Sequence, residues 1–282
     1  KKSVASLVSG GGIGLALAKE LVSRGAHTVL IGRSEPAQDV SEWAASTDGQ
    51  VTLCAADVCD LPALEQALKG RRITGLFHAA GLLADGAVEA VSPDVGDLAR
   101  QVKALGLTNT WAACGETLEW SVAIGSWAAR FGNRHQTHYA SANGLMAGLA
   151  LQPTGSFHSC VAEFGPWTES DMAQTIPASV RASLRAEGVD FTANGPGLNA
   201  LMRDMRKDGC IVHGRRVPSA LRRRTLNHTI ALETHPYLKD HAIDGVPVVP
   251  MVAALDWIAQ AADLKPPYEV NNLTLYRGIT VT

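Results

Sequence analysis

The sequence lacks the features by which disulfide-rich, metal-binding and membrane proteins are recognised. Its five cysteines are scattered and odd in number, and no pair has CxxC or zinc-ligand spacing, which favours reduced thiols and predicts no metal site. No apolar run reaches the ~20 residues that a membrane-spanning helix needs. The first apolar run breaks at glycines after a few residues, so no signal peptide is expected. These absences predict a soluble, cytoplasmic protein.

An excess of charge of one sign is also missing. The formal net charge is −2 and the pI about 6.5, so the chain as a whole has no attraction to nucleic acid or to an anionic membrane. A local basic cluster is the exception, formed by Arg215, Arg216, Arg222, Arg223 and Arg224. This cluster is interpreted as a solvated linker, with a docking surface for an acidic carrier protein as the alternative.

Short apolar runs alternate with longer amphipathic segments through the first two-thirds of the chain. The runs at 4–8, 27–31, 51–55, 75–78, 120–124 and 159–164 predict strands, and the segments at 15–24, 62–68, 95–113 and 139–151 predict helices. Nearly continuous apolar strands that alternate with helices are typical of a parallel sheet covered on both faces. The sequence therefore predicts an α/β fold with a Rossmann-like, doubly wound parallel sheet.

The pattern changes in the last third of the chain. Residues 191–197 are rich in turn formers, and beyond the basic cluster residues 226–233 and 273–281 read as strands and 251–262 as an apolar helix. We expect a boundary near 215–225, which gives a first domain at 1–215 and a second, partial segment at 216–282.

A glycine cluster follows the first predicted strand and opens the first predicted helix. Ser9, Gly10, Gly11 and Gly14 lie in this turn, where glycines let the backbone approach a pyrophosphate at the helix N-terminus. A plain turn is the alternative for a glycine cluster taken alone. The strand–glycine–helix context favours a dinucleotide site.

Residues at the ends of the next strands indicate which dinucleotide binds. Arg33 ends the second strand, where an acid would select NAD and an arginine accommodates the 2′-phosphate of NADP. Asp57 and Val58 follow the third strand, within reach of the adenine, and Ala80 and Gly81 follow the fourth, where small residues leave room for the cofactor. The predicted cofactor is NADPH.

Four polar residues form the candidate catalytic group. Tyr139 and Asn143 are four residues apart and share one face of a predicted helix, while Ser126 follows a strand. Reduction of a ketone by hydride leaves an alkoxide that must be protonated. Tyr139 would supply the proton, Lys103 would be the cation that lowers its pKa, and Ser126 would donate to the carbonyl oxygen.

These motifs together resemble the ketoreductase domains of polyketide and polyunsaturated-fatty-acid synthases, a branch of the short-chain dehydrogenases. Those domains carry Tyr-x-x-x-Asn with the lysine moved upstream, as in Tyr139–Asn143 with Lys103. The loop differs from the family pattern in Ala16, which replaces its last glycine. The resemblance covers roughly residues 3–190.

The resemblance implies NADPH-dependent reduction of a β-ketoacyl thioester on the phosphopantetheine arm of an acyl carrier protein, with other synthase domains in cis. Two alternatives stay open: a free-standing short-chain dehydrogenase acting on a small ketone or alcohol, and an inactive structural domain. Asp85 matches part of the family marker for the D-alcohol product, and Gln136 replaces the tryptophan that marks the opposite class. A D-alcohol product is therefore expected.

The second segment resembles the hotdog dehydratases of the same synthases. His241, Gly245 and Pro250 match their His-x-x-x-Gly-x-x-x-x-Pro motif, and Asp256 lies six residues after Pro250, where dissociated dehydratases place their acid. The resemblance makes His241 the base of a dehydration and Asp256 a candidate acid, with an acid in a second, downstream hotdog as the alternative. Only part of an α+β hotdog is present, and we expect no dehydratase activity from this segment alone.

Overall fold

The computed structural model describes residues 3–7, 12–83, 85–174, 176–186, 189–214, 229–261, 265 and 279–281. The chain forms two compact units, Lys1–Ser219 and Ala220–Thr282. The predicted division at 215/216 and the basic cluster at 215–224 lie outside the described residues, and the division stays a prediction.

The first unit is built on a seven-stranded parallel sheet in the order β3-β2-β1-β4-β5-β6-β7. The strands are β1 (Ser3–Leu7), β2 (His27–Gly32), β3 (Val51–Ala55), β4 (Ile73–His78), β5 (Trp120–Ser126), β6 (His158–Phe164) and β7 (Gly209–Val212). From β1, the strands β2 and β3 extend the sheet on one side, and β4 to β7 extend it on the other. The predicted Rossmann-like doubly wound sheet is confirmed.

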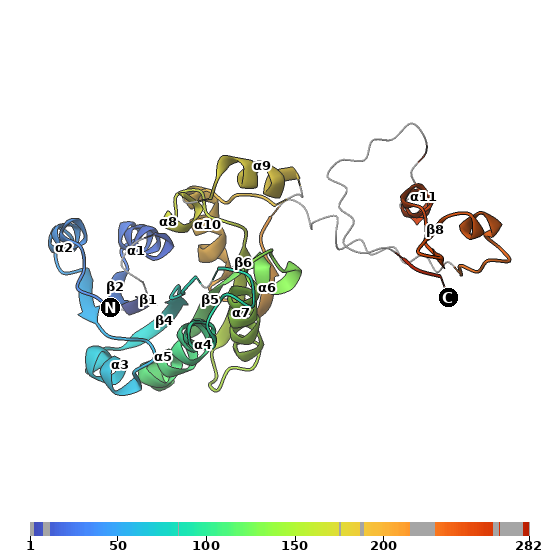
Figure 1. Ribbon diagram of the computed structural model, residues 1–282. Helices are drawn as coiled ribbons and strands as arrows, with labels where there is room; N and C mark the ends of the chain where they lie inside the picture. Colours follow the sequence, from blue (N-terminus) through green and yellow to red (C-terminus); the bar gives the residue numbers. More distant parts are fainter. Residues whose placement is uncertain are drawn as a thin grey trace. The chain divides into compact units, whose positions relative to one another are not determined.

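Helices cover both faces of this sheet (Figure 1). One face carries α1 (Ile13–Ser23), α2 (Gln38–Ala45) and α10 (Asn194–Asp204), and the other carries α3 (Leu61–Leu68), α4 (Pro93–Arg100), α5 (Gly106–Cys114) and α7 (Thr137–Ala150). The other helices of the unit are η2 (Gly115–Thr117), α6 (Trp127–Phe131), α8 (Asp171–Gln174) and α9 (Ala178–Ala186).

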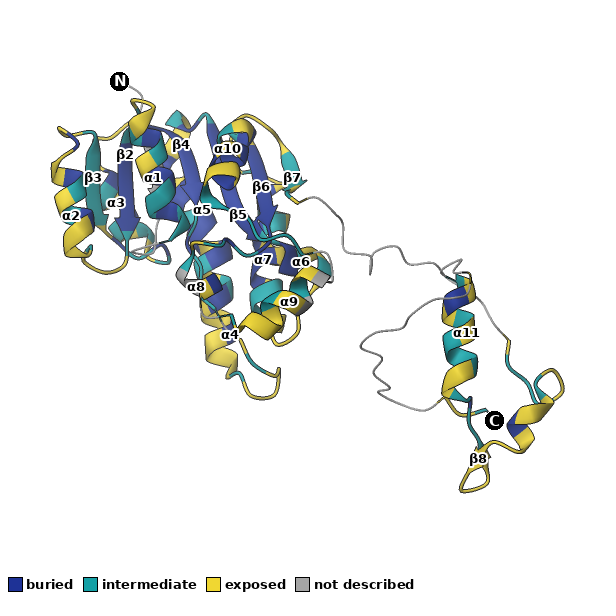
Figure 2. Ribbon diagram, turned by 90° about the horizontal axis from the view of Figure 1, so that it is seen from above, coloured by how far each residue is buried: buried dark blue, intermediate teal, exposed yellow. Residues whose placement is uncertain are grey.

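Two apolar clusters hold the helices against the sheet. Leu76, Leu107 and Met146 belong to the cluster under α5 and α7, and Phe77 and Leu201 belong to the one under α1 and α10. Figure 2 shows the central strands buried and the outer helix faces exposed. Strands buried on both faces explain why their sequences are nearly continuous apolar runs.

The predicted helix at 95–113 is interrupted by a π-helical turn. Residues Gln101–Leu105 (η1) connect α4 to α5 with wider backbone geometry, and Lys103 lies in this turn. Single π turns inside helices are frequent at functional sites. The sequence did not predict this turn, because a five-residue insertion of π geometry hardly changes the 3.6-residue hydrophobic period.

The second unit contains η4 (Pro236–Lys239), β8 (Ala242–Ile243), β9 (Val246–Pro247) and α11 (Met251–Ala261). β8 and β9 pair antiparallel, and Thr280 forms an antiparallel bridge to Val248, within the segment predicted as a strand at 273–281. Residues 273–278 of that segment lie outside the described part of the chain.

The strand predicted at 226–233 is wrong for the residues that the structure describes. Residues 226–228 lie outside them, 229–231 have no regular structure, and 232–234 form a turn. The Ala231 carbonyl accepts the backbone N–H groups of Thr234 and His235 and the Thr234 hydroxyl. This local hydrogen bonding competes with a strand.

Among the described residues, no helix is long and apolar enough to cross a membrane.

Candidate active site

Ser126 ends β5 and caps helix α6. Its Oγ accepts the backbone N–H of Ala128 at 3.2 Å, and its backbone is extended, as expected of an N-cap. The hydroxyl lies at the carboxyl edge of the sheet and is partly buried. Because Oγ accepts the Ala128 N–H, the hydroxyl proton can be donated only to a second group, and the Tyr139 side chain is one such partner.

Tyr139 and Asn143 lie one turn apart on α7, as predicted. Asn143 is fully buried, its Nδ2 donates to the Tyr139 carbonyl at 2.9 Å, and its Oδ1 has no partner in the described part of the chain. Burial raises the pKa of Tyr139, and hydrogen bonding with the Ser126 and Asn143 side chains opposes that shift in part. The structure therefore brings three of the four predicted catalytic side chains together.

The predicted effect of Lys103 on Tyr139 is wrong for this structure. The sequence predicts that a cation lowers the tyrosine pKa, but burial raises it and Lys103 is not among the groups that shift it. Lys103 is buried, and its Nζ donates to the Ile124 carbonyl on β5 at 2.8 Å. Desolvation lowers the pKa of Lys103 to about 8.

His78 lies at the end of β4 beside the π turn. The ring is fully buried, and neither of its nitrogens has a hydrogen-bond partner among the described residues. Burial, and then the charge of Lys103, lower the pKa of His78 to about 3. A neutral imidazole beside Lys103 adds no repulsion to the buried ammonium.

Hydrogen bonds join the loop after β4 to the loop before α7. Gln136 Nε2 donates to both carboxylate oxygens of Asp85, at 3.1 and 3.0 Å, and the Gly86 N–H donates to the His135 carbonyl at 2.7 Å. The two residues expected to mark the stereochemistry of the product are therefore hydrogen-bonded to each other. The Asp85 charge acts to raise the pKa of Tyr139, after burial.

The glycine loop is described only at its end. Ser9, Gly10 and Gly11 lie outside the described residues, whereas Gly14 is buried in α1. Gly12 caps α1 with φ 68°, a left-handed conformation that suits glycine, and its carbonyl accepts the Ala16 N–H at 3.2 Å. The N-terminus of α1 begins here, at the edge of the sheet where β1 ends.

Arg33, Asp57 and Val58 converge at the carboxyl ends of β2 and β3. The Asp57 carboxylate accepts the Cys59 N–H at 2.9 Å, and Arg33 is close enough to oppose the burial-driven rise of the Cys59 pKa to about 11. Arg33 is exposed and forms no ion pair in the described part of the chain. An exposed guanidinium directly after β2 fits the 2′-phosphate of NADP.

A cavity of about 280 Å³ adjoins this corner. Gly32 and Ser34, the neighbours of Arg33, line it together with Leu15, Val40 and Leu53. Its place beside the ends of β2 and β3 suits the adenosine half of a dinucleotide.

Small residues after β4 make room for the buried lysine. Ala80 is buried, and a Cβ on Gly81 would lie 3.1 Å from Lys103 Cε. Val58 packs against α5, where a Cβ on Gly106 would lie 2.7 Å from Val58 Cγ2. Gly81, a predicted cofactor residue, therefore also leaves room for the Lys103 side chain.

The candidate dehydratase residues of the second unit are both exposed. His241 follows η4, and its carbonyl accepts the Val248 N–H at 2.9 Å. Asp256 lies on α11 and accepts a hydrogen bond from Gln260 Nε2 at 2.7 Å. No hydrogen bond joins His241 to Asp256 in the structure as described.

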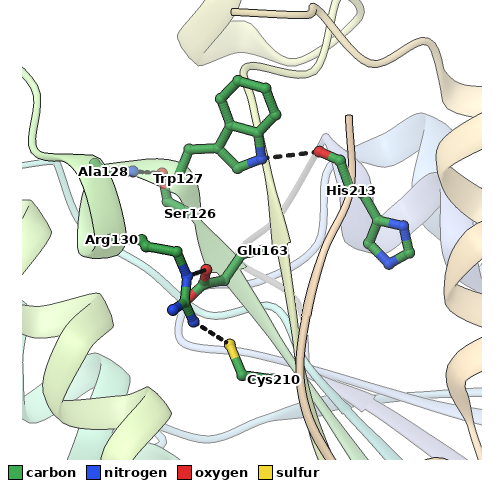
Figure 3. Close-up of polar contacts among 7 residues, drawn as sticks. All are labelled: Ser126, Trp127, Ala128, Arg130, Glu163, Cys210 and His213. Atoms are coloured by element: carbon green, nitrogen blue, oxygen red, sulfur yellow. Dashed lines mark hydrogen bonds and ion pairs between the residues drawn. The ribbon is translucent and has the colours of Figure 1, made fainter. Parts of the chain in front are cut away.

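Sequence reasoning missed the residues that fasten the segment after Ser126. Arg130 Nε donates to the buried Glu163 at 2.8 Å, and Trp127 Nε1 donates to the His213 carbonyl at 2.8 Å (Figure 3). Neither pair has a spacing or motif that marks it, because the partners lie 33 and 86 residues apart.

Comparison with known families gives two matches. Residues 5–169 match the KR domain, and residues 213–282 match the polyketide synthase dehydratase domain.

Curated relatives are large synthases. A component of the polyunsaturated fatty acid synthase of Thraustochytrium sp. is 29% identical over 80% of this chain and 8% of that protein. Erythronolide synthase EryA3 of Saccharopolyspora erythraea is 32% identical over 59% of this chain and 6% of that protein. The chain thus spans less than a tenth of the length of these two relatives.

Solved structures show the same fold. Gluconate 5-dehydrogenase from Burkholderia cenocepacia, in complex with NADP and tartrate, is 18% identical with a TM-score of 0.65, covering 76% of this chain and 94% of that one. A short-chain dehydrogenase/reductase variant from Serratia marcescens is 20% identical with a TM-score of 0.65, covering 75% and 96%.

Proposed function

This chain belongs to the KR domain family, and on that premise we propose that it catalyses NADPH-dependent reduction of a carrier-bound β-ketoacyl thioester to the β-hydroxyacyl thioester. The observation that carries the proposal is the group formed by Ser126, Tyr139 and Asn143. Lys103 is buried and donates to the Ile124 carbonyl, two residues before Ser126. The relatives are polyketide and polyunsaturated fatty acid synthases, which supports a substrate held on an acyl carrier protein.

In this proposal Ser126 and Tyr139 have different roles in the reduction. When bound, NADPH supplies the hydride that adds to the carbonyl carbon. The oxygen gains negative charge, which the Ser126 hydroxyl stabilises by donating a hydrogen bond. Tyr139 Oη then gives its proton to that oxygen. Burial raises the pKa of Tyr139 and so opposes this transfer, whereas hydrogen bonding with the Ser126 and Asn143 side chains lowers the pKa and favours it.

Lys103 and Asn143 support the tyrosine in this proposal. Asn143 fixes the turn of α7 that carries Tyr139, and its buried Oδ1 has no partner among the described residues. Lys103, with a pKa of about 8, is charged at neutral pH, and its Nζ donates to the Ile124 carbonyl at 2.8 Å, which holds the end of β5 that carries Ser126.

The chain's own residues would hold the cofactor at the carboxyl edge of the sheet. Gly12 and Gly14 open α1, and we assign the pyrophosphate to this helix N-terminus together with Ser9–Gly11. Arg33 would bind the 2′-phosphate, and Asp57 with Val58 would flank the adenine. The exposed guanidinium of Arg33, which has no ion-pair partner among the described residues, supports this role.

We further propose that residues 1–215 form the ketoreductase domain and residues 216–282 the beginning of a dehydratase domain with a hotdog fold. The dehydratase-domain match over 213–282 supports the second assignment. His241 and Asp256 stay candidate base and acid there, and both are exposed. We propose no dehydration by this segment on its own.

The test is NADPH oxidation by the 282-residue chain with a β-ketoacyl N-acetylcysteamine thioester. Turnover should fall by about 10²-fold or more in Tyr139→Phe, because the general acid is lost. Tyr237→Phe is the matched control, since this half-exposed tyrosine lies in the second unit. An inactive wild type would support the scaffold alternative, and full activity of Tyr139→Phe would refute the mechanism. Preference for a small free ketone over the thioester would favour a free-standing dehydrogenase.

A further inference from the structure

Helix α6, which follows Ser126 directly, is too short to be stable by itself. It contains only the five residues Trp127–Phe131, and isolated helices below ~12–15 residues are marginal in water. Its position, and with it the position of the Ser126 hydroxyl at its N-cap, must therefore come from contacts with the rest of the fold.

The C-terminal end of α6 is anchored to β6 and β7. Arg130 Nε donates to Glu163 Oε2 at 2.8 Å, and Arg130 Nη2 contacts Cys210 Sγ at 3.0 Å (Figure 3). The Glu163 side chain is only 2% exposed. A buried carboxylate must be paired, so this ion pair fixes where Arg130 lies.

The N-terminal end of α6 is anchored through Trp127. The indole is buried, and its Nε1 donates to the His213 carbonyl at 2.8 Å (Figure 3). The ring also lies against the backbone of Gly214, where a Cβ would come 2.1 Å from Trp127 Cζ2. Only glycine at 214 permits this contact.

The acceptor of this hydrogen bond is itself held by other contacts. The His213 N–H donates to the Glu163 carbonyl at 2.8 Å, and its ring is 2.6 Å from Asp204 Oδ2. The same ring stacks on Phe164 with a centroid distance of 4.4 Å. The His213 carbonyl is thus a fixed point at the end of the last strand of the sheet.

We infer that Trp127 is a positioning residue for Ser126: its indole hydrogen bond to the His213 carbonyl sets the backbone of residues 126 and 127 and so aims the Ser126 hydroxyl at the substrate oxygen. This inference rests on the proposed function, in which Ser126 donates to that oxygen. Trp127 touches no reacting atom and acts through its neighbour.

The expected signature is a lower kcat with little change in KM. Trp127→Phe keeps an aromatic ring but removes the N–H, so Ser126 loses its alignment with the oxyanion that forms in the transition state. We expect kcat to fall roughly tenfold, a part of the 10²–10³-fold loss that removal of an oxyanion donor causes. NADPH binding, followed by its fluorescence, should be unchanged.

A double-mutant cycle separates positioning from a general loss of stability. In a Ser126→Ala background, Trp127→Phe should cause no further fall in kcat, since the group that it positions is already absent. Trp111→Phe is the matched control: that buried indole donates to Ser121 Oγ at 2.9 Å, away from α6. It should lose stability in urea unfolding and keep its kcat.

Gly214→Ala provides a second variant, which displaces the indole without removing its N–H. It should reproduce the fall in kcat. Equal losses from Trp127→Phe in both backgrounds, or full kcat in both Trp127→Phe and Gly214→Ala, would overturn the inference alone. An inactive wild type, or a fully active Ser126→Ala, would overturn the proposed function and this inference with it.

Discussion

Replacing Lys103 by methionine should abolish reduction yet leave the fold as stable as before or more stable. The buried ammonium has a pKa of about 8 in place of 10.5. At about 1.4 kcal/mol per pH unit, keeping it charged at pH 7 costs roughly 3 kcal/mol of folding free energy. The methionine variant is relieved of this cost but loses the hydrogen bond to the Ile124 carbonyl, which destabilises it by about 1–3 kcal/mol.

The sharper test is the pH dependence of this stability difference. Below pH 8 Lys103 is protonated in both the folded and unfolded states, so it gives stability no slope with pH. Between about 8 and 10.5 the unfolded chain binds the proton and the folded one does not, so wild-type stability rises with pH. As pH falls back through 8 this gain, up to roughly 3 kcal/mol, is lost.

Urea unfolding of wild type and Lys103→Met from pH 7 to 10 measures the difference, in which all other titrating groups cancel. The advantage of the methionine variant should shrink steadily above pH 8. Lys69→Met, at an exposed position, should show a difference that is independent of pH. A flat difference for Lys103→Met as well would refute a buried ammonium at this site.

Three further predictions concern other parts of the first unit. Arg33→Ala should lower the kcat/KM ratio of NADPH over NADH by about 10–100-fold, because a charged hydrogen bond to the 2′-phosphate is worth about 1.5–3 kcal/mol. In urea unfolding, Gly75→Ala should lower the free energy of unfolding by about 3 kcal/mol, since the added Cβ would lie 2.0 Å from the Trp120 indole. Its control, Gly144→Ala, has nothing within 4 Å of the added Cβ and should raise the free energy of unfolding by about 0.5–1 kcal/mol by stabilising α7. Gln136→Ala frees Asp85 and should lower the proportion of the D-alcohol, measured by chiral chromatography of the product.

The sheet could be predicted because burial on both faces leaves a simple mark. The strand predicted at 51–55 coincides with β3, and the others agree with the structure to within about two residues at each end. β7 (Gly209–Val212) was not predicted: its four residues lie at the edge of the sheet and are only partly buried. A short edge strand carries too few apolar positions to stand out.

The helices that were missed depend on tertiary contacts. Helix α10 begins at Asn194, inside the stretch read as turn-rich, and is held by Leu198 and Leu201, which pack in the apolar core. Helix α6 is stabilised by Arg130 and Trp127, and the π turn around Lys103 leaves the hydrophobic period almost unchanged. No local pattern encodes these features.

The candidate catalytic group was predicted on different grounds, and its catalytic role stays a prediction. The four-residue spacing of Tyr139 and Asn143 specifies one helix face, Ser126 follows a predicted strand, and Lys103 is a cation on the predicted helix before it. The electrostatics were not predictable, since the pKa of Tyr139 depends on how deeply it is buried and on its hydrogen bonding with Ser126 and Asn143. Both are properties of the packed structure.

Contacts between residues far apart in the sequence also bear on where the proposed ketoreductase domain ends. The family resemblance stops near residue 190, after every motif residue has been passed. Yet Ser126 is held by an indole whose acceptor lies 86 residues further along the chain, and that acceptor is fixed by Asp204 and Phe164. A boundary placed at the end of the motifs would keep all four catalytic side chains and remove the strand that aims one of them. The proposed boundary at 215/216 keeps both His213 and Gly214, which is the physical reason to prefer it.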